Sequence, residues 1–247
     1  MCYHYSIAKT AEEISAVYNL PIKEPGINPE PVCFHANGFN FPLLPIVYKD
    51  YKANDLKFEF MNWGLVPAWV KNEEQALSIR GMTLNARADT IDIKPSFRAA
   101  YRYRPCLVPA TGYFEWMHYK GGKYPFYIYV NDQVIFSFAG IWEEWTSIQT
   151  GEIIRSFSII TCEANSMTAK IHNTKKRMPV IIDRKTENDW FDHDIRNKNR
   201  KELLKAYEPG KMDAYSIGKM ISSRNQDSNV PEVLNPFQYN EIKTDLN

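Results

Sequence analysis

Runs rich in β-branched and aromatic residues dominate the middle of the chain and predict strands. They fall at residues 57–61, 124–130, 134–142, 155–162 and 178–182. The first of them alternates apolar and polar positions, which is typical of a strand with one buried face. The polar link at residues 131–133 predicts that the strands on either side of it form a hairpin.

Helical patterns are short and lie outside these runs. Thr10 and Glu13 have the spacing of a capping box, and apolar residues follow at helical spacing, so a helix is expected over residues 10–20. Further short helices are expected at residues 163–171, 187–191 and 201–207. Six prolines between residues 21 and 45 indicate an extended connection there.

No internal repeat, low-complexity tract or flexible linker divides the sequence of 247 residues. One α+β domain over residues 1–247 is therefore the simplest interpretation. The tail, residues 222–247, is polar and is expected to be partly mobile.

Composition and charge exclude several classes of protein. The formal net charge is +1, so total charge does not argue for nucleic acid, and a basic surface would have to come from local clustering. No apolar run is long enough to span a membrane, and the N-terminus lacks the pattern of a signal peptide. The four cysteines are far apart, which predicts reduced thiols in a cytoplasmic protein and disfavours a structural zinc site.

Cys2 is the position with the most distinctive chemistry. A small second residue permits removal of Met1, after which Cys2 would carry a free α-amine and a thiol on adjacent carbons. The amine has a reference pKa of about 7.7–8.0, so a useful fraction is neutral at pH 7 and can condense with an aldehyde. The thiol can then close a thiazolidine ring. Position alone favours the simpler alternative, an incidental residue in a frayed terminus.

Four interior motifs accompany Met1-Cys2. They are 63–69 (Trp-Gly-Leu-Val-Pro-Ala-Trp), 84–89 (Leu-Asn-Ala-Arg-Ala-Asp), 106–116 (Cys-Leu-Val-Pro-Ala-Thr-Gly-Tyr-Phe-Glu-Trp) and 171–180 (Ile-His-Asn-Thr-Lys-Lys-Arg-Met-Pro-Val). In this order they resemble the SRAP family, the SOS response-associated peptidases or abasic site processing proteins. The resemblance runs from Cys2 to about Ile182.

The resemblance implies a fold and an activity. The fold is a mostly antiparallel, barrel-like sheet core with peripheral helices. The partner is single-stranded DNA containing abasic sites, whose aldehyde the terminal cysteine captures as a thiazolidine crosslink that protects the lesion. Self-removal of Met1 and lyase-type incision are also associated with the family. No cofactor, metal or membrane is implied, and a monomer that joins the nucleoid when bound to DNA is expected.

The resemblance also assigns catalytic roles. Cys2 would be the nucleophile, Glu115 a general acid and base, His172 an acid or base during ring opening, and Asn85 the amide that orients the amine and the sugar. Each has a plainer alternative. Glu115 could be a surface ion-pair partner, His172 a hydrogen-bonded structural histidine, and Asn85 a turn or capping residue.

Four further residues are expected to bind DNA. Arg87 and Arg177 match arginines that grip phosphates, and Trp69 matches an aromatic on which a base could stack. His4 stands where most members have arginine, after Tyr3 in place of glycine. His4 could replace the missing phosphate contact when it is protonated. The alternative for the arginines is a solvated face.

Other departures concern single segments. Residues 174–176 interrupt the usual His-Asn-Arg-Met-Pro run and could move Arg177 or lengthen a loop over the DNA. Asp89 stands where glutamate is common. Residues 37–40 (Asn-Gly-Phe-Asn) differ from the usual Asn-x-x-Pro segment, so the resemblance assigns no role there.

Two rival functions remain open. The first is a cysteine hydrolase that uses the Cys2 thiol with His172 and either Asn85 or Glu115 on a peptide or amide. The second is a non-catalytic module that binds single-stranded DNA. The crosslinker is the preferred interpretation, because binding alone gives no reason for these four residues to occur together.

Overall fold

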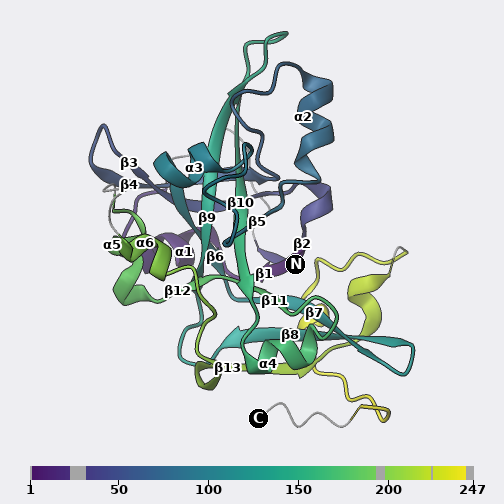
Figure 1. The fold of residues 1–247 in the computed structure, drawn as a ribbon. Coiled ribbons are helices and arrows are strands. Elements are labelled where there is room, and N and C mark those ends of the chain that lie inside the picture. Colours follow the sequence, from purple (N-terminus) through teal and green to yellow (C-terminus); the bar gives the residue numbers. More distant parts are fainter. Residues whose placement is uncertain (1, 23–31, 193–197, 224, 243–247) are drawn as a thin grey trace.

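A closed barrel of five strands forms the larger part of the core (Figure 1). The computed structural model describes residues 2–22, 32–192, 198–223 and 225–242. The barrel strands are β3 (Leu43–Asp50), β4 (Asp55–Trp63), β6 (Pro105–Ala110), β9 (Phe136–Thr146) and β10 (Ile153–Glu163). They pair in the order β10–β4–β3–β6–β9, and β9 pairs back with β10 to close the ring. Only the β4–β10 contact in this ring is parallel.

Three short strands extend the barrel beside β10 and β9. They are β5 (Asn85–Arg87), β11 (Arg177–Pro179) and β12 (Ile181–Ile182). β5 runs parallel to β10, and β11 runs antiparallel to it. Thr161 of β10 is in register with Arg87 of β5 and with Pro179 of β11. Two motifs that are 90 residues apart in the sequence therefore border the same strand.

The second sheet continues directly from the barrel. Its order is β13–β8–β7–β1–β2, and Thr111 links the end of β6 to the start of β7. The strands are β1 (His4–Ile7), β2 (Cys33–Asn37), β7 (Gly112–Tyr119), β8 (Gly122–Val130) and β13 (Met212–Ser216). In Figure 1 the strands β7, β8 and β13 of this sheet lie below the barrel, and β1 lies higher, between them and the barrel.

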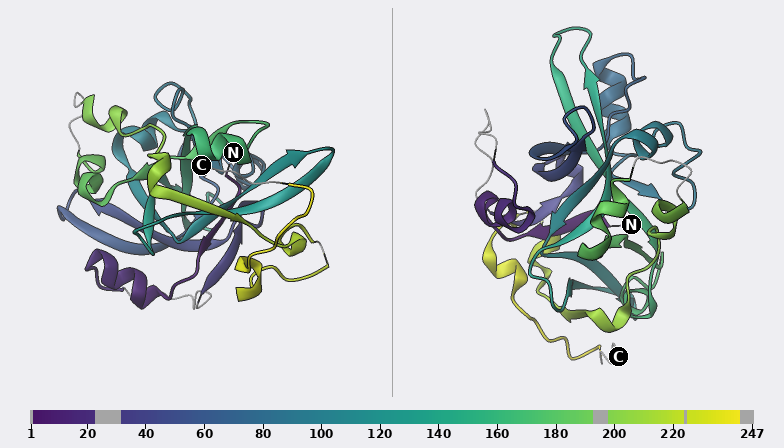
Figure 2. Two further views of the ribbon diagram at one scale, coloured as in Figure 1. Left: turned by 90° about the horizontal axis from the view of Figure 1, so that it is seen from below. Right: turned by 90° about the vertical axis from the view of Figure 1, so that its left-hand side faces the viewer.

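Helices lie outside both sheets (Figure 2). They are α1 (Ala11–Tyr18), α2 (Glu73–Arg80), α3 (Arg98–Tyr103), α4 (Ser166–Ile171), α5 (Glu187–Trp190) and α6 (Lys198–Glu202). This arrangement confirms the α+β class and the barrel-like core with peripheral helices. Among the described residues, none of the helices combines the length and apolarity needed to cross a bilayer.

Aromatic side chains fix β1 against the barrel. Tyr5 is fully buried, and its ring meets Trp63 of β4 and Phe138 of β9 edge-on, at centroid distances of 5.2 and 5.7 Å. Buried aromatic pairs of this geometry contribute about 0.5–1.5 kcal/mol each beyond their burial. The start of the chain is thus anchored in the core.

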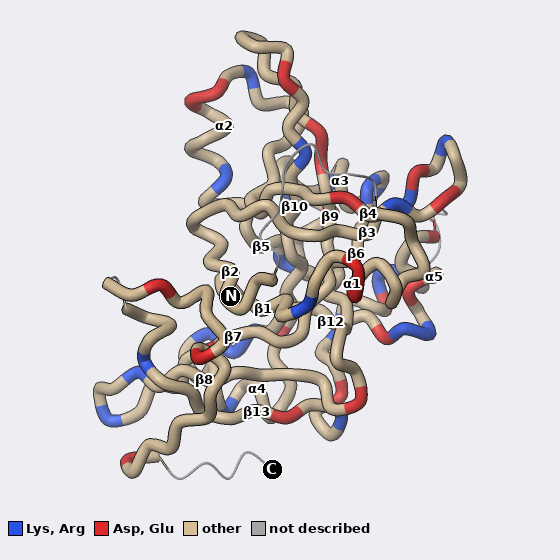
Figure 3. The backbone as a smooth tube through the Cα atoms, turned by 180° about the vertical axis from the view of Figure 1, so that it is seen from behind, with Lys and Arg blue, Asp and Glu red and all other residues tan. Residues whose placement is uncertain are grey.

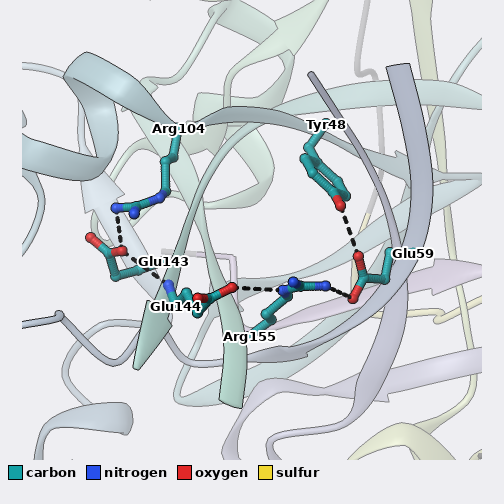
Figure 4. Close-up of polar contacts among 6 residues, drawn as sticks. All are labelled: Tyr48, Glu59, Arg104, Glu143, Glu144 and Arg155. Carbon is teal, nitrogen blue, oxygen red and sulfur yellow. Dashed lines mark hydrogen bonds and ion pairs between the residues drawn. The ribbon is translucent and has the colours of Figure 1, made fainter. Parts of the chain in front are cut away.

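A charged network ties neighbouring barrel strands together (Figure 4). Arg155 of β10 donates to Glu144 of β9 over 3.0 Å and to Glu59 of β4 over 2.5 Å. Tyr48 of β3 donates to the second oxygen of Glu59 over 2.9 Å. The network thus joins four consecutive strands of the ring by their side chains.

Several predicted elements are confirmed. The helix expected at residues 10–20 is α1, and Thr10 and Glu13 form both hydrogen bonds of the capping box. The strands expected at residues 57–61 and 155–162 are β4 and β10, and each is longer than predicted. The helices expected at residues 163–171 and 187–191 are α4 and α5.

The predicted hairpin at residues 131–133 is wrong. β8 belongs to the second sheet and β9 to the barrel, so the link crosses between sheets. β8 instead forms a hairpin with β7 through Lys120 and Gly121, whose φ angles are 46° and 79°. A two-residue turn with both φ angles positive matches the twist of paired strands. The polar residues 131–133 suit a hairpin turn as well as a crossing between two sheets, so their polarity alone did not identify which of the two occurs.

Three other predictions need correction. The extended connection at residues 21–45 contains β2 and the start of β3, although residues 23–31 lie outside the described part. The strand expected at residues 178–182 is split, because β11 pairs with β10 and β12 with β9. The helix expected at residues 201–207 is misplaced, since α6 ends at Glu202.

The polar tail packs against the second sheet over residues 225–242. Asn229 accepts hydrogen bonds from the backbone of Phe34 and His35, and the Tyr239 hydroxyl donates to the Ile217 carbonyl. Val233 is buried. These contacts hold residues 225–242 on the second sheet, and residues 224 and 243–247 of the tail lie outside the described part.

Candidate functional site

Cys2 lies fully buried, two residues before the first residue of β1. Its carbonyl accepts a 2.8 Å hydrogen bond from Asn85 Nδ2 of β5, and its thiol points to the His4 carbonyl at 3.5 Å. Asn85 itself is 7% exposed, and its Oδ1 is buried without a hydrogen-bond partner among the described residues. The amide nitrogen of Asn85 therefore holds the backbone of Cys2, and the amide oxygen can accept a further hydrogen bond.

Glu115 and His172 meet each other, and Glu115 lies near enough to Cys2 to raise the pKa of its thiol. Glu115 projects from β7, and His172 follows the last residue of α4. Their Oε1 and Nδ1 atoms are 3.3 Å apart, and both side chains are almost completely buried. His172 Nδ1 also lies 2.8 Å from the Arg177 carbonyl, which places the ring proton on Nδ1 and leaves the Nε2 lone pair as the basic atom.

Burial sets the protonation of all three groups. It raises the pKa of Glu115 to about 8 and lowers the pKa of His172 to about 4, so both are uncharged at pH 7. Burial, followed by the nearby Glu115 carboxyl, raises the pKa of the Cys2 thiol well above its ordinary value. The contact between Glu115 and His172 is thus one between neutral partners, and Cys2 is a thiol.

A cleft of about 1160 Å³ opens beside the pair of Glu115 and His172, whereas the buried Cys2 and Asn85 do not line it. Glu115, His172 and Tyr3 contribute to its wall, next to five cationic side chains: Arg87, Lys123, Lys175, Lys176 and Arg177. Glu163 is the one acidic lining residue besides Glu115. Over the whole chain, positions of both signs are interspersed (Figure 3), so the positive charge of the cleft is a local feature.

The two arginines differ in their freedom. Arg87 is about half exposed. Its Nε and Nη2 atoms donate to the two carboxylate oxygens of Asp89 over 3.0 and 2.5 Å. Arg177 is 9% exposed, and its Nη2 donates to the carbonyl and hydroxyl of Thr161 on β10. Arg87 can exchange Asp89 for a phosphate, whereas Arg177 is largely engaged in joining β11 to β10.

Trp69 stands outside the lining of the cleft, and His4 belongs to it. Trp69 is 49% exposed, donates to the Pro95 carbonyl over 3.3 Å, and stands outside the set of residues that line the cleft. His4 lines the cleft, but its Nδ1 is 2.8 Å from His35 Nε2. Burial, together with His35, lowers the pKa of His4 to about 3, so His4 lacks the positive charge that the expected phosphate contact requires.

Sequence reasoning missed a residue that positions the loop. Asn173 donates to the His118 carbonyl over 2.8 Å and accepts from the His118 amide over 3.1 Å, which docks the loop after α4 on β7. The motif at residues 171–180 contains Asn173, but it does not indicate this pairing, because the two partners are 55 residues apart. The interrupting residues 174–176 all line the cleft.

Within the described ranges, no three His, Cys, Asp or Glu side chains gather as a metal site would require.

Comparisons with known proteins show which family this sequence is similar to. The chain matches the sequence profile of the SOS response associated peptidase (SRAP) family over residues 1–224. Abasic site processing protein YoqW of Bacillus subtilis (strain 168) is 31% identical over 176 residues, covering 70% of this chain and 74% of that protein. Abasic site processing protein HMCES of Gallus gallus is 28% identical over 213 residues, covering 78% and 61%.

The fold has a similarly broad match. A crystal structure of a protein from Bacteroides thetaiotaomicron aligns with a TM-score of 0.86 at 40% identity, over 96% of this chain and all of that one. The family match spans the barrel, the second sheet and the four expected catalytic residues, Cys2, Asn85, Glu115 and His172. This chain therefore belongs to the SRAP family, as its motifs predict.

Proposed function

We propose that this protein processes abasic sites in single-stranded DNA by forming a covalent crosslink through Cys2. The observations that carry the proposal are two contacts beside a basic cleft: Asn85 holds the Cys2 carbonyl, and Glu115 meets His172 in the wall of the cleft. Relatives named abasic site processing proteins supply the substrate class. Removal of Met1 gives Cys2 the free amine that the chemistry needs.

The crosslink forms in three balanced steps. The Cys2 amine attacks the aldehyde carbon of the ring-opened sugar, and a carbinolamine results. Its hydroxyl takes a proton and leaves as water while the carbon–nitrogen double bond forms. The thiol sulfur then adds to the same carbon, and its proton passes to nitrogen. One aldehyde and one terminal cysteine give one thiazolidine and one water, so no oxidant or cofactor is consumed.

The neighbouring side chains suit these steps. Glu115 holds a proton at pH 7 because burial raises its pKa, so it can protonate the departing hydroxyl. His172 is a neutral imidazole at that pH, so its Nε2 can accept a proton from the amine or the thiol. Asn85 holds the Cys2 carbonyl and therefore limits where the amine can lie.

The cleft supplies the affinity for DNA. Arg87, Lys123, Lys175 and Lys176 provide cations for the phosphates. Trp69, which does not line the cleft, offers a half-exposed ring on which a base outside the cleft could stack. Single-stranded DNA fits better than a duplex, because its backbone can bend into the cleft and expose the sugar.

The buried thiol disfavours the hydrolase alternative. A cysteine hydrolase needs a thiolate, which usually requires a lowered pKa. Burial raises the pKa of Cys2 instead, and His172 is paired with a carbonyl and a neutral carboxyl. Peptide cleavage beyond Met1 and lyase-type incision are therefore secondary to crosslinking in this proposal.

A denaturing gel tests the proposal. Protein lacking Met1 is incubated with a single-stranded oligonucleotide that carries one abasic site. We expect a shifted band without added reductant. Cys2→Ala retains a terminal amine but no thiol, so its adduct should appear only after the imine is trapped with borohydride. Equal, reductant-independent bands for both proteins would contradict the role of the thiol.

A further inference from the structure

Tyr3 and Phe39 form an aromatic pair at the edge of the cleft, which we call the aromatic ledge. Their ring centroids are 4.9 Å apart and tilted by 41°. Tyr3 lines the cleft, and Phe39 is 52% exposed. A single exposed aromatic residue is ordinary. Two adjoining rings beside a basic cleft offer a stacking surface.

The turn that carries Phe39 is held in place. Phe39 belongs to a short 3-10 turn, Gly38–Asn40, which Asn37 caps through a 3.1 Å hydrogen bond to the Phe39 amide. The Gly38 amide donates to the Tyr3 carbonyl over 2.9 Å. A Cβ on Gly38 would lie 3.1 Å from the Trp63 ring, so glycine permits this close packing. The exposed ring is thus presented by an ordered backbone.

The ledge lies next to the reacting residue. Tyr3 directly follows Cys2 in the chain, and both Glu115 and His172 line the same cleft as Tyr3. Because consecutive Cα atoms are about 3.8 Å apart, a base that neighbours a sugar held at Cys2 would lie close to Tyr3. One stacking surface of this size can serve one of the two neighbouring bases.

We propose that the aromatic ledge stacks the nucleobase on one side of the abasic site and so positions the lesion at Cys2. The inference rests on the proposed function and adds a base-binding site to it. Stacking on an aromatic side chain tolerates any base, because every base has a π face. The larger surface of purines predicts that a purine on that side binds more tightly than a pyrimidine.

The test uses single strands that bind but cannot crosslink. Each oligonucleotide carries a tetrahydrofuran analogue of the abasic site, which has no aldehyde. One has adenine on both sides, and two others lack the base on the 5′ or the 3′ side. Phe39→Leu is compared with Phe237→Leu, a matched control that is 51% exposed and pairs with Tyr239 at 4.7 Å, outside the cleft. Affinities are measured by fluorescence anisotropy, and thermal unfolding confirms that both variants fold.

The ledge predicts a coupled loss. Removal of the base on one side should weaken binding about fivefold or more, both for the wild-type protein and for Phe237→Leu. About fivefold corresponds to the lower end of the range for loss of one base–aromatic stack. Phe39→Leu should bind the complete strand about as weakly as the wild-type protein binds the strand that lacks this base. Removal of the base should then reduce the affinity of Phe39→Leu little further. Equal effects of the base in wild type and Phe39→Leu would overturn the ledge, even if both still crosslink to a natural abasic site. Absence of any binding or crosslinking by wild type would instead overturn the proposed function.

Discussion

At the scale of single residues, burial sets the protonation states that the chemistry needs. Glu115 and His172 touch at 3.3 Å, yet both are neutral at pH 7 because each is almost completely buried. Glu115 is therefore a proton donor and His172 a proton acceptor at the same pH. Acid and base roles are divided between two contacting groups without an ion pair.

Glu115 makes stability depend on pH in a defined direction. Its pKa rises from 4.5 to about 8 on folding, so the folded protein binds more protons than the unfolded chain between these values. Its contribution to stability is present at acidic pH and is lost as the pH rises toward 8. We expect Glu115→Gln, which cannot ionise, to gain stability relative to wild type as denaturation is measured from pH 5 to 8.5. A constant difference across this range would refute the raised pKa.

His172 has the opposite dependence on pH. Its pKa falls from 6.5 to about 4 on folding, so the folded protein binds fewer protons between these values. Stability that is present above pH 6.5 is lost as the pH falls toward 4. His172→Gln should remove this part of the acid loss in urea unfolding curves, while crosslinking at pH 7 slows by about tenfold or more. Unchanged crosslinking would exclude His172 as the base.

Asn85 is expected to act by positioning Cys2. Asn85→Asp removes the Nδ2 donor and places a carboxylate beside the Cys2 carbonyl. Loss of the partner of a buried carbonyl costs about 1–3 kcal/mol. We predict a lower melting temperature and crosslinking that is slower by at least about tenfold at saturating DNA. Normal rates at saturating DNA would limit Asn85 to a structural role.

At the scale of elements, the site depends on which segments border β10 and β7. β5 carries Asn85 and Arg87 along one side of β10, and β11 carries Arg177 along the other. Asn173 then fixes the loop after α4 to β7, which holds Glu115. Asn173→Ala should therefore slow crosslinking, because His172 is displaced. Among substitutions of Asn173, those that cannot bond both the amide and the carbonyl of His118 should give the slowest crosslinking. Crosslinking equal to wild type would show that the loop is held by other contacts.

The charged network on the barrel predicts a modest stability effect. Arg155→Met leaves Glu59 and Glu144 without their shared partner. Because Arg155 is partly exposed, the expected loss in the free energy of unfolding is about 1 kcal/mol. Arg98→Met on α3, where the arginine is exposed, is the control and should change stability little. Equal effects of the two substitutions in urea titrations would show that the network adds nothing.

Sequence patterns predicted local features better than pairings. The capping box located α1, and β-rich runs located β4 and β10, because those signals lie within a few residues. The false hairpin after Val130 and the divided run of β11 and β12 failed because partner choice is set by distant strands. Likewise, motifs supplied Cys2, Asn85, Glu115 and His172, but their contacts emerge only from the fold. The neutrality of His4 needed knowledge of His35, which no motif includes.

At the scale of the whole molecule, a nearly neutral protein concentrates cations in one cleft. The net charge is +1, but five cationic side chains line the cleft. Replacing Lys175 and Lys176 with alanine should weaken single-strand binding and reduce the slope of log affinity against log salt by about 1.4, or 0.7 for each lost phosphate contact. Alanine at Lys52 and Lys185, both exposed outside the cleft, should leave that slope unchanged. Equal slopes for both double variants would place the DNA elsewhere.

The intact mass of the isolated adduct tests the central claim most directly. The account predicts a mass equal to that of the protein without Met1 plus the abasic oligonucleotide minus one water. Peptide mapping should place the DNA on Cys2, and its sulfur should resist alkylation because it is part of the ring. An adduct that retains Met1, lies on a lysine, or leaves the Cys2 thiol open to alkylation would contradict the thiazolidine mechanism.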